Sequence, residues 1–126
     1  MARNSKKLKM KPNNKPQGLY WDNHSARYYL LLQGDEGRKI VVSYLYFQME
    51  MVGQSRVLRF DEDCDVAELD EEHSLNRQCC IDYMGVVGQD LELRVQDPNL
   101  SYTERVVVEV PKELQRHLPE KVPSKD

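Results

Sequence analysis

The chain has no long hydrophobic run, and it has few cysteines. None of its apolar stretches approaches the roughly 18 residues of a membrane-spanning helix, and the basic start leads into Asn and Pro instead of an apolar signal core. Its three cysteines, two of them adjacent, do not provide the even number of a disulfide framework. These absences predict a protein of a reducing compartment, the cytoplasm or the nucleus, with no membrane partner.

Spacings typical of metal sites and nucleophiles are absent as well. Cys79 and Cys80 are neighbours that a strand would direct to opposite faces, and the chain has no Cys-x-x-Cys or His-x-His pair for zinc. A cysteine nucleophile, Cys64 or one of the adjacent pair, stays open as an alternative that no further signature accompanies. We therefore expect no catalytic residue, no metal and no cofactor, and a protein that is not an enzyme.

The acidic run of residues 61–72 matches a calcium-binding loop only in part. Asp61, Asp63 and Asp65 stand where such a loop has its first, third and fifth ligands. Val66, however, occupies the position where the loop needs glycine for its sharp turn, and no amphipathic helices flank the run. The run is therefore predicted to be a solvated acidic loop.

Charges of opposite sign are separated along the chain. Residues 1–16 hold six Lys or Arg and no acid, whereas residues 61–72 hold eight Asp or Glu and no base. Each block could bind a partner of opposite charge, and the basic block could bind phosphates or act as a nuclear localisation signal. Without the six cations of the tail, a net charge of −3 becomes about −9 for the rest of the chain, an unfavourable field for nucleic acid.

Residues 27–48 are predicted to form the central β-hairpin. Two arms rich in Tyr, Val, Ile and Leu meet at a Gly-Asp-Glu-Gly corner, where Gly34 and Gly37 allow the positive φ that a tight turn needs. Alternation puts Tyr28 and Leu30 on one face and Tyr29 and Leu31 on the other. Because both faces are apolar, one must meet the core and the other a second layer, a loop or a partner.

That second face, together with the acidic run, is the predicted contact surface for a partner or for self-association. Its residues are Tyr29, Leu31, Val41, Leu45 and Phe47, or else their opposite-facing neighbours, with Asp61, Asp63 and Asp65 from the acidic run.

Further short apolar alternations follow the hairpin at intervals of about ten residues, with no βαβ pattern. Residues 90–96 and 104–110 alternate most clearly, whereas residues 66–75 fit either a helical turn or an edge strand. The pattern predicts an all-β fold, a seven- to eight-stranded antiparallel sandwich, with a small barrel of the oligonucleotide-binding (OB) type as the alternative. The predicted parts are a basic disordered tail (1–17), the β domain (18–111), and a short helix with a charged tail (112–126).

The order of features resembles the CS domain, the β-sandwich of small co-chaperones and adaptors of the ninety-kilodalton heat-shock chaperone. Trp21-Asp22-Asn23 stands at the aromatic start, residues 28–32 form the next strand, and Gly34-Asp35-Glu36 forms the acidic corner. The resemblance implies a non-enzymatic, protein-binding co-chaperone or complex-assembly adaptor, with a heat-shock chaperone as a possible partner.

The alternative is an OB-type subunit of a nucleic-acid-binding complex, which would use its basic tail and exposed aromatic rings. A barrel of that type would place a helix near residues 66–75, whereas a CS-like sandwich would have two stacked sheets and no helix there.

Overall fold

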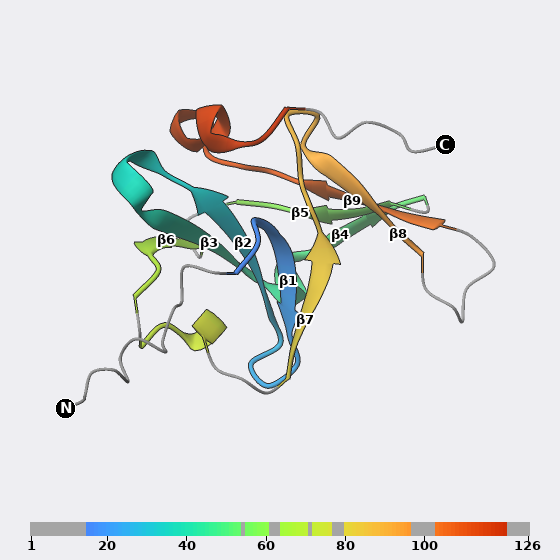
Figure 1. The fold of residues 1–126 in the computed structure, drawn as a ribbon. Helices are drawn as coiled ribbons and strands as arrows, with labels where there is room; N and C mark the ends of the chain where they lie inside the picture. The colour runs from blue at the N-terminus through green and yellow to red at the C-terminus, as the bar shows by residue number, and fades with distance from the viewer. Residues whose placement is uncertain are drawn as a thin grey trace.

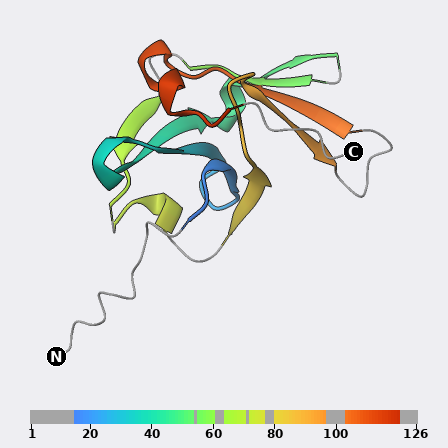
Figure 2. The ribbon, with the colours of Figure 1, turned by 45° about the horizontal axis from the view of Figure 1, so that its top comes forward.

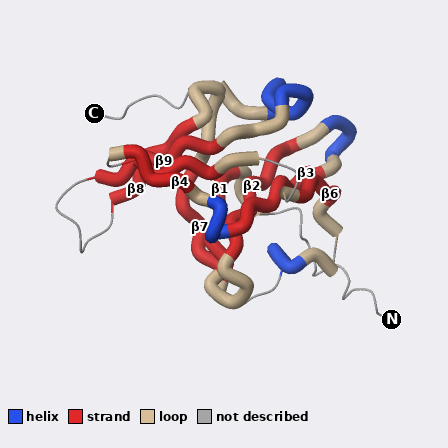
Figure 3. Tube along the Cα trace, turned by 180° about the vertical axis from the view of Figure 1, so that it is seen from behind, coloured by secondary structure: helices blue, strands red, loops and turns tan. Residues whose placement is uncertain are grey.

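The computed structural model describes residues 15–53, 55–60, 64–70, 72–76, 80–96 and 103–120. Within these ranges nine strands form two sheets (Figure 1), which confirms the prediction of an all-β sandwich. Helices in the described part are short 3₁₀ turns near the ends of strands (Figure 3). Most of the basic tail and Asp61, Asp63 and Cys79 lie outside the described residues.

The first sheet is antiparallel and has the strand order β6-β3-β2-β1-β7. Its strands are β1 (Gly18–Asp22), β2 (Arg27–Gln33), β3 (Lys39–Leu45), β6 (Asp65–Glu68) and β7 (Ile81–Gly85). Residues 66–75, which the sequence left ambiguous, supply β6 and the single-turn η4 (Ser74–Asn76). No α-helix occurs in the described stretches 65–70 and 72–76, so this part of the chain has the form expected of a sandwich.

The second sheet has four strands in the order β4-β5-β9-β8. They are β4 (Glu50–Val52), β5 (Ser55–Leu58), β8 (Glu92–Gln96) and β9 (Thr103–Val108). β5 and β9 pair in parallel, unlike the antiparallel arrangement that the sequence predicted. The reason is the path of the chain: it leaves this sheet after β5, adds β6 and β7 to the other sheet, and returns, so a long crossover separates the two strands.

The β2–β3 hairpin has the predicted alternation of faces but a different corner. Leu30 pairs with Val42, Leu31 with Val41, and the ladder closes at Gln33 and Lys39. The corner is the turn η2 (Asp35–Gly37), in which Glu36 and Gly37 have positive φ of 61° and 78°.

Gly34 does not use the positive φ that glycine allows, because its φ is −87°. A Cβ built at Gly34 would lie 2.8 Å from Ile40 Cδ1, so a close approach explains the glycine better than its backbone angle does.

Both faces of the hairpin are covered within the chain. Tyr28, Leu30 and Val42 belong to the main core between the sheets, where they pack with residues of β5 and β9. Tyr29, Leu31 and Val41 belong to a second cluster on the opposite face, which Leu69 and Leu75 cover. The segment that follows β6 therefore provides the second layer that the doubly apolar pattern required.

Polar contacts tie the two sheets together at the edge of the main core. Arg56 on β5 donates from Nη1 to the Tyr28 hydroxyl on β2 at 2.8 Å. Its Nε lies 2.7 Å from Glu104 Oε2 on β9, an ion pair whose partners are mostly shielded from solvent. The Tyr44 hydroxyl donates to the backbone oxygen of Glu109 at 2.5 Å. The Tyr28 and Tyr44 contacts join the two layers. Arg56 Nε meets Glu104 only as an ion pair within the second sheet and has no hydrogen-bond partner among the described residues.

We expect Leu30→Ala and Leu31→Ala each to lower the free energy of unfolding by about 2–5 kcal/mol, because both leave a cavity in a packed cluster. Both side chains have 0% exposure although they point to opposite faces. Phe47→Ala is the control: its side chain is 77% exposed, so the change should stay near 0.5 kcal/mol. Denaturant unfolding measures all three. A Leu31→Ala protein as stable as Phe47→Ala would mean that the second cluster is not packed in solution.

His73 belongs to the segment that covers the second cluster. Its Nδ1 accepts the backbone N–H of Leu75 at 3.0 Å, and its ring meets Tyr29 edge-on at 5.4 Å. Burial lowers the pKa of His73 from its ordinary value of 6.5, against the opposing effect of Asp70. Protonation would also remove the acceptor that Leu75 uses.

Acid should therefore loosen this segment. A lowered pKa means that neutral His73 stabilises the folded state fully above pH 6.5, and that this contribution is lost as the pH falls through the lowered value. His73→Asn keeps an acceptor but does not titrate. Melting temperatures at pH 7.5 and pH 5 should differ less in this variant than in the natural chain. An equal difference would show that His73 does not couple to folding.

A candidate partner-binding groove

The predicted contact residues do not form one surface. Tyr29, Leu31 and Val41 are 4%, 0% and 0% exposed, so the second cluster leaves them nothing to offer a partner. Leu45 is half-buried at the end of β3, and Phe47 is exposed in η3 (Tyr46–Gln48). Asp65, from the acidic run, is exposed on β6.

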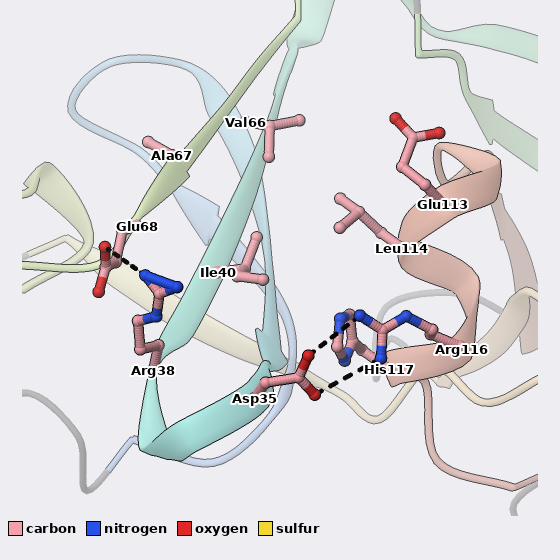
Figure 4. A pocket seen from close by; sticks show the side chains of 10 residues that line it. All are labelled: Asp35, Arg38, Ile40, Val66, Ala67, Glu68, Glu113, Leu114, Arg116 and His117. Atoms are coloured by element: carbon pink, nitrogen blue, oxygen red, sulfur yellow. Dashed lines mark hydrogen bonds and ion pairs between the residues drawn. The ribbon is translucent and has the colours of Figure 1, made fainter.

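A groove of about 480 Å³ opens between the hairpin corner, β6 and the turn η5 (Lys112–His117). Figure 2 shows η5 at the same end of the molecule as the corner, and Figure 4 shows the lining side chains. The lining residues are Asp35, Arg38, Ile40, Val66, Ala67, Glu68, Glu113, Leu114, Arg116 and His117.

The floor of the groove is apolar. Ile40, from β3, and Leu114, from η5, pack against the main core. Their side chains face each other across the bottom of the groove (Figure 4). Val66 pairs directly with Val42 and therefore shares its core-directed face of the sheet. Val42 is fully buried, yet Val66 is 46% exposed. The core-directed face of the sheet thus continues into the open groove at β6.

Two ion pairs stand on the rim. Arg116 donates to Asp35 Oδ2 at 3.0 Å and so ties η5 to the hairpin corner. Arg38 lies 3.8 Å from Glu68. Hydrogen bonding and charge from Arg116 hold the pKa of Asp35 below its ordinary value. All four side chains are more than half exposed, so these pairs contribute little to stability and can exchange partners.

β6 forms one edge of the five-stranded sheet, and all four of its residues are exposed. The Leu69 N–H donates to Lys39 O at 2.8 Å, which makes these two residues a hydrogen-bonded pair of the β3–β6 ladder. Because such pairs alternate along antiparallel strands, the backbone groups of Val66 and Glu68 point away from β3. Within the described residues no strand pairs with that side. The outward-facing backbone N–H and C=O groups of β6 therefore lie next to the apolar floor of the groove.

The described cysteines do not assemble a reactive centre. Cys64 is buried, and its Sγ donates to Arg59 O at 3.3 Å, whereas Cys80 is exposed at the start of β7. Among the residues that the structure describes, no group of three or more His, Cys, Asp or Glu side chains is placed to hold a metal ion. No helix in this part of the chain is long and apolar enough to cross a membrane.

A cluster of three aromatic rings lies at the end of the hairpin away from the groove, and of these rings only Tyr46 is exposed. Trp21 contacts Tyr28 and Tyr46 at ring-centroid distances of 4.7 and 5.2 Å. Its Nε1 donates to Asn23 Oδ1 at 2.9 Å. Since Trp21 is half-buried against the main core, the arrangement is that of a packed end of the sandwich.

Comparison with protein-family models, with curated proteins and with solved structures found no match for the chain. The function must therefore be argued from the groove itself.

Sequence reasoning missed the groove. Ile40 and Leu114 belong to alternations or turns that looked like ordinary core. The one available signal was Val66-Ala67, a pair of apolar residues inside a run of eight acids, which is unexpected in a purely solvated loop.

Replacing Arg116 by Gln should raise the pKa of Asp35 toward its ordinary value of 3.8, because Arg116 provides the largest lowering effects. The ion pair between Arg116 and Asp35 is fully formed at neutral pH, and it is lost as the pH falls through the lowered pKa of Asp35. Carboxyl-carbon NMR titration measures this value directly. Arg38→Gln is the matched control, and its shift should be smaller, since Arg38 acts on Asp35 only weakly. Equal shifts in both variants would contradict the assigned pairing.

Proposed function

We propose that this protein is a non-enzymatic, protein-binding β-sandwich that acts as a complex-assembly adaptor or co-chaperone, and that its contact surface is the groove with the free edge of β6. The observation that supports this proposal is the exposure of Val66, whose side chain is 46% exposed on the core-directed face of the sheet. An apolar side chain in that place is stabilised by cover that another molecule supplies.

The shape and chemistry of the groove favour a polypeptide as the ligand. An edge strand offers backbone donors and acceptors to an extended segment, and a neighbouring apolar floor accepts one of its side chains. A binder of this kind needs no reactive group. The rim fits this role, because Arg116 holds Asp35 in its charged form with a lowered pKa, whereas a general acid or base works best with a pKa near neutrality.

The adaptor and co-chaperone classes are supported by the resemblance to the CS domain and by the two-sheet architecture. We place the nucleic-acid alternative second. Exposed Tyr46 and Phe47 favour it, but the groove is lined by Asp35, Glu68 and Glu113 beside Arg38 and Arg116. It therefore offers phosphates no net positive field.

Val66→Lys should remove specific protein partners while the fold survives. Val52→Lys is a matched control, because Val52 is an exposed valine (61%) on β4, an edge strand of the other sheet. Quantitative affinity purification from cells, with a photo-crosslinking residue at position 67 to report proximity, compares the two variants. Proteins that crosslink and are lost only with Val66→Lys support the proposal. Equal losses in both variants, or none in either, would overturn it.

A further inference from the structure

We infer that the groove takes an extended basic segment of a partner protein, one in which apolar residues alternate with Lys or Arg, as an added strand beside β6. This inference rests on the proposed function and specifies the chemistry of the partner.

The backbone of β6 sets the conformation of that segment. Val66 and Glu68 direct their N–H and C=O groups to the free edge, two residues apart, which is the repeat that a neighbouring strand offers in return. The strand has only four residues, so a short stretch of the partner is enough to satisfy it. Edge strands without such a partner are a known risk of unwanted pairing, which proteins limit by keeping them short and charged.

The groove sets the alternation of the side chains. Val42 and Val66 are neighbours on one face of the sheet, and the next position in that row belongs to the added strand. A side chain there lies over the groove, beside Ile40 and Leu114. Every second residue of the added strand points to this face and the others point away. Apolar residues therefore suit alternate positions only.

Charge sets the remaining positions. β6 lies inside the run of residues 61–72, which has eight acids and no base. Of these acids, Asp65, Glu68, Asp70 and Glu72 are described and exposed. Of these four acids, only Glu68 has an ion-pair partner among the described residues. Glu68 shares the groove-side face with Val66, so Asp65 is the acid of β6 on the other face. Lys or Arg side chains on the added strand would meet this field favourably, and a second copy of β6 would be repelled by it.

A synthetic seven-residue peptide in which valine alternates with lysine is the probe. Titrated into the full-length, ¹⁵N-labelled protein, it should shift the amide signals of Val66, Ala67 and Glu68, and its binding should weaken as salt rises. A peptide with Glu in place of Lys should bind at least about tenfold more weakly. N-methylation of every second backbone nitrogen blocks strand pairing but keeps every side chain. Two such peptides are possible, methylated at odd or at even positions, and one of them should fail to bind β6.

The variants Val66→Lys and Val52→Lys test the location. The first should lose the probe and the second should keep it. Equal binding of the lysine and glutamate peptides, or no loss with either methylated peptide, would overturn the inference. If cellular partners are still lost with Val66→Lys in that case, the proposed function stands and only the partner chemistry is wrong.

The chain itself contains a competing occupant, because Leu8 and Met10 alternate with Lys7, Lys9 and Lys11. A full-length variant with Leu8→Asp and Met10→Asp distinguishes the two sources. Unchanged probe affinity supports a partner segment. Markedly tighter probe binding in this variant would assign the site to the chain's own basic segment and overturn the partner assignment.

Discussion

A β-hairpin that is apolar on both faces needs cover on both, and the rest of the structure follows from that requirement. The four-stranded sheet covers one face of β2 and β3 and buries Leu30 and Val42. The other face buries Leu31 and Val41, and no third sheet covers it within the described residues. The chain uses the segment that carries Leu69, which lies inside the acidic run, and Leu75, which follows that run. The hydrophobic effect thus draws a highly charged stretch onto the domain.

The same requirement explains why the groove exists. To bring Leu69 onto the outer face, the chain must first pass alongside β3, and this passage is β6. β6 therefore extends the first sheet by one strand on the side where η5 leaves Val66 half uncovered. Arg116 reaches across to Asp35 and fixes η5 to the corner, so the groove has a wall on either side of its apolar floor. Exposure at Val66 is a consequence of burial at Leu69.

Local pattern was enough to predict the central hairpin and the last strands, but it left residues 66–75 ambiguous and did not predict long-range pairing. Alternation at residues 28–32 and 40–44 assigned both faces correctly, and Val106 and Val108 are core residues as their spacing indicated. Parallel pairing of β5 with β9 could not be predicted, because it depends on which sheet the intervening strands join. The exposure of Val66 could not be predicted either. The apolar pair Val66-Ala67 inside the acidic run indicates that the run is not a purely solvated loop, but it does not show that the cover of Val66 is missing. The role of Gly34 was misassigned because its constraint comes from Ile40, a contact across the hairpin.

The parallel pair also has a consequence for the order in which the fold forms. Hydrogen-bonded neighbours such as Ser55 and Arg105 are 50 residues apart in the chain, whereas the hairpin ladder closes over a few residues. Loop-closure entropy favours the local ladder, so we expect β2 and β3 to form early and the four-stranded sheet to be completed last. During synthesis β5 emerges well before β9, its partner. Until that partner arrives, β5 is an open edge, and this is the interval in which the nascent chain is most exposed to aggregation.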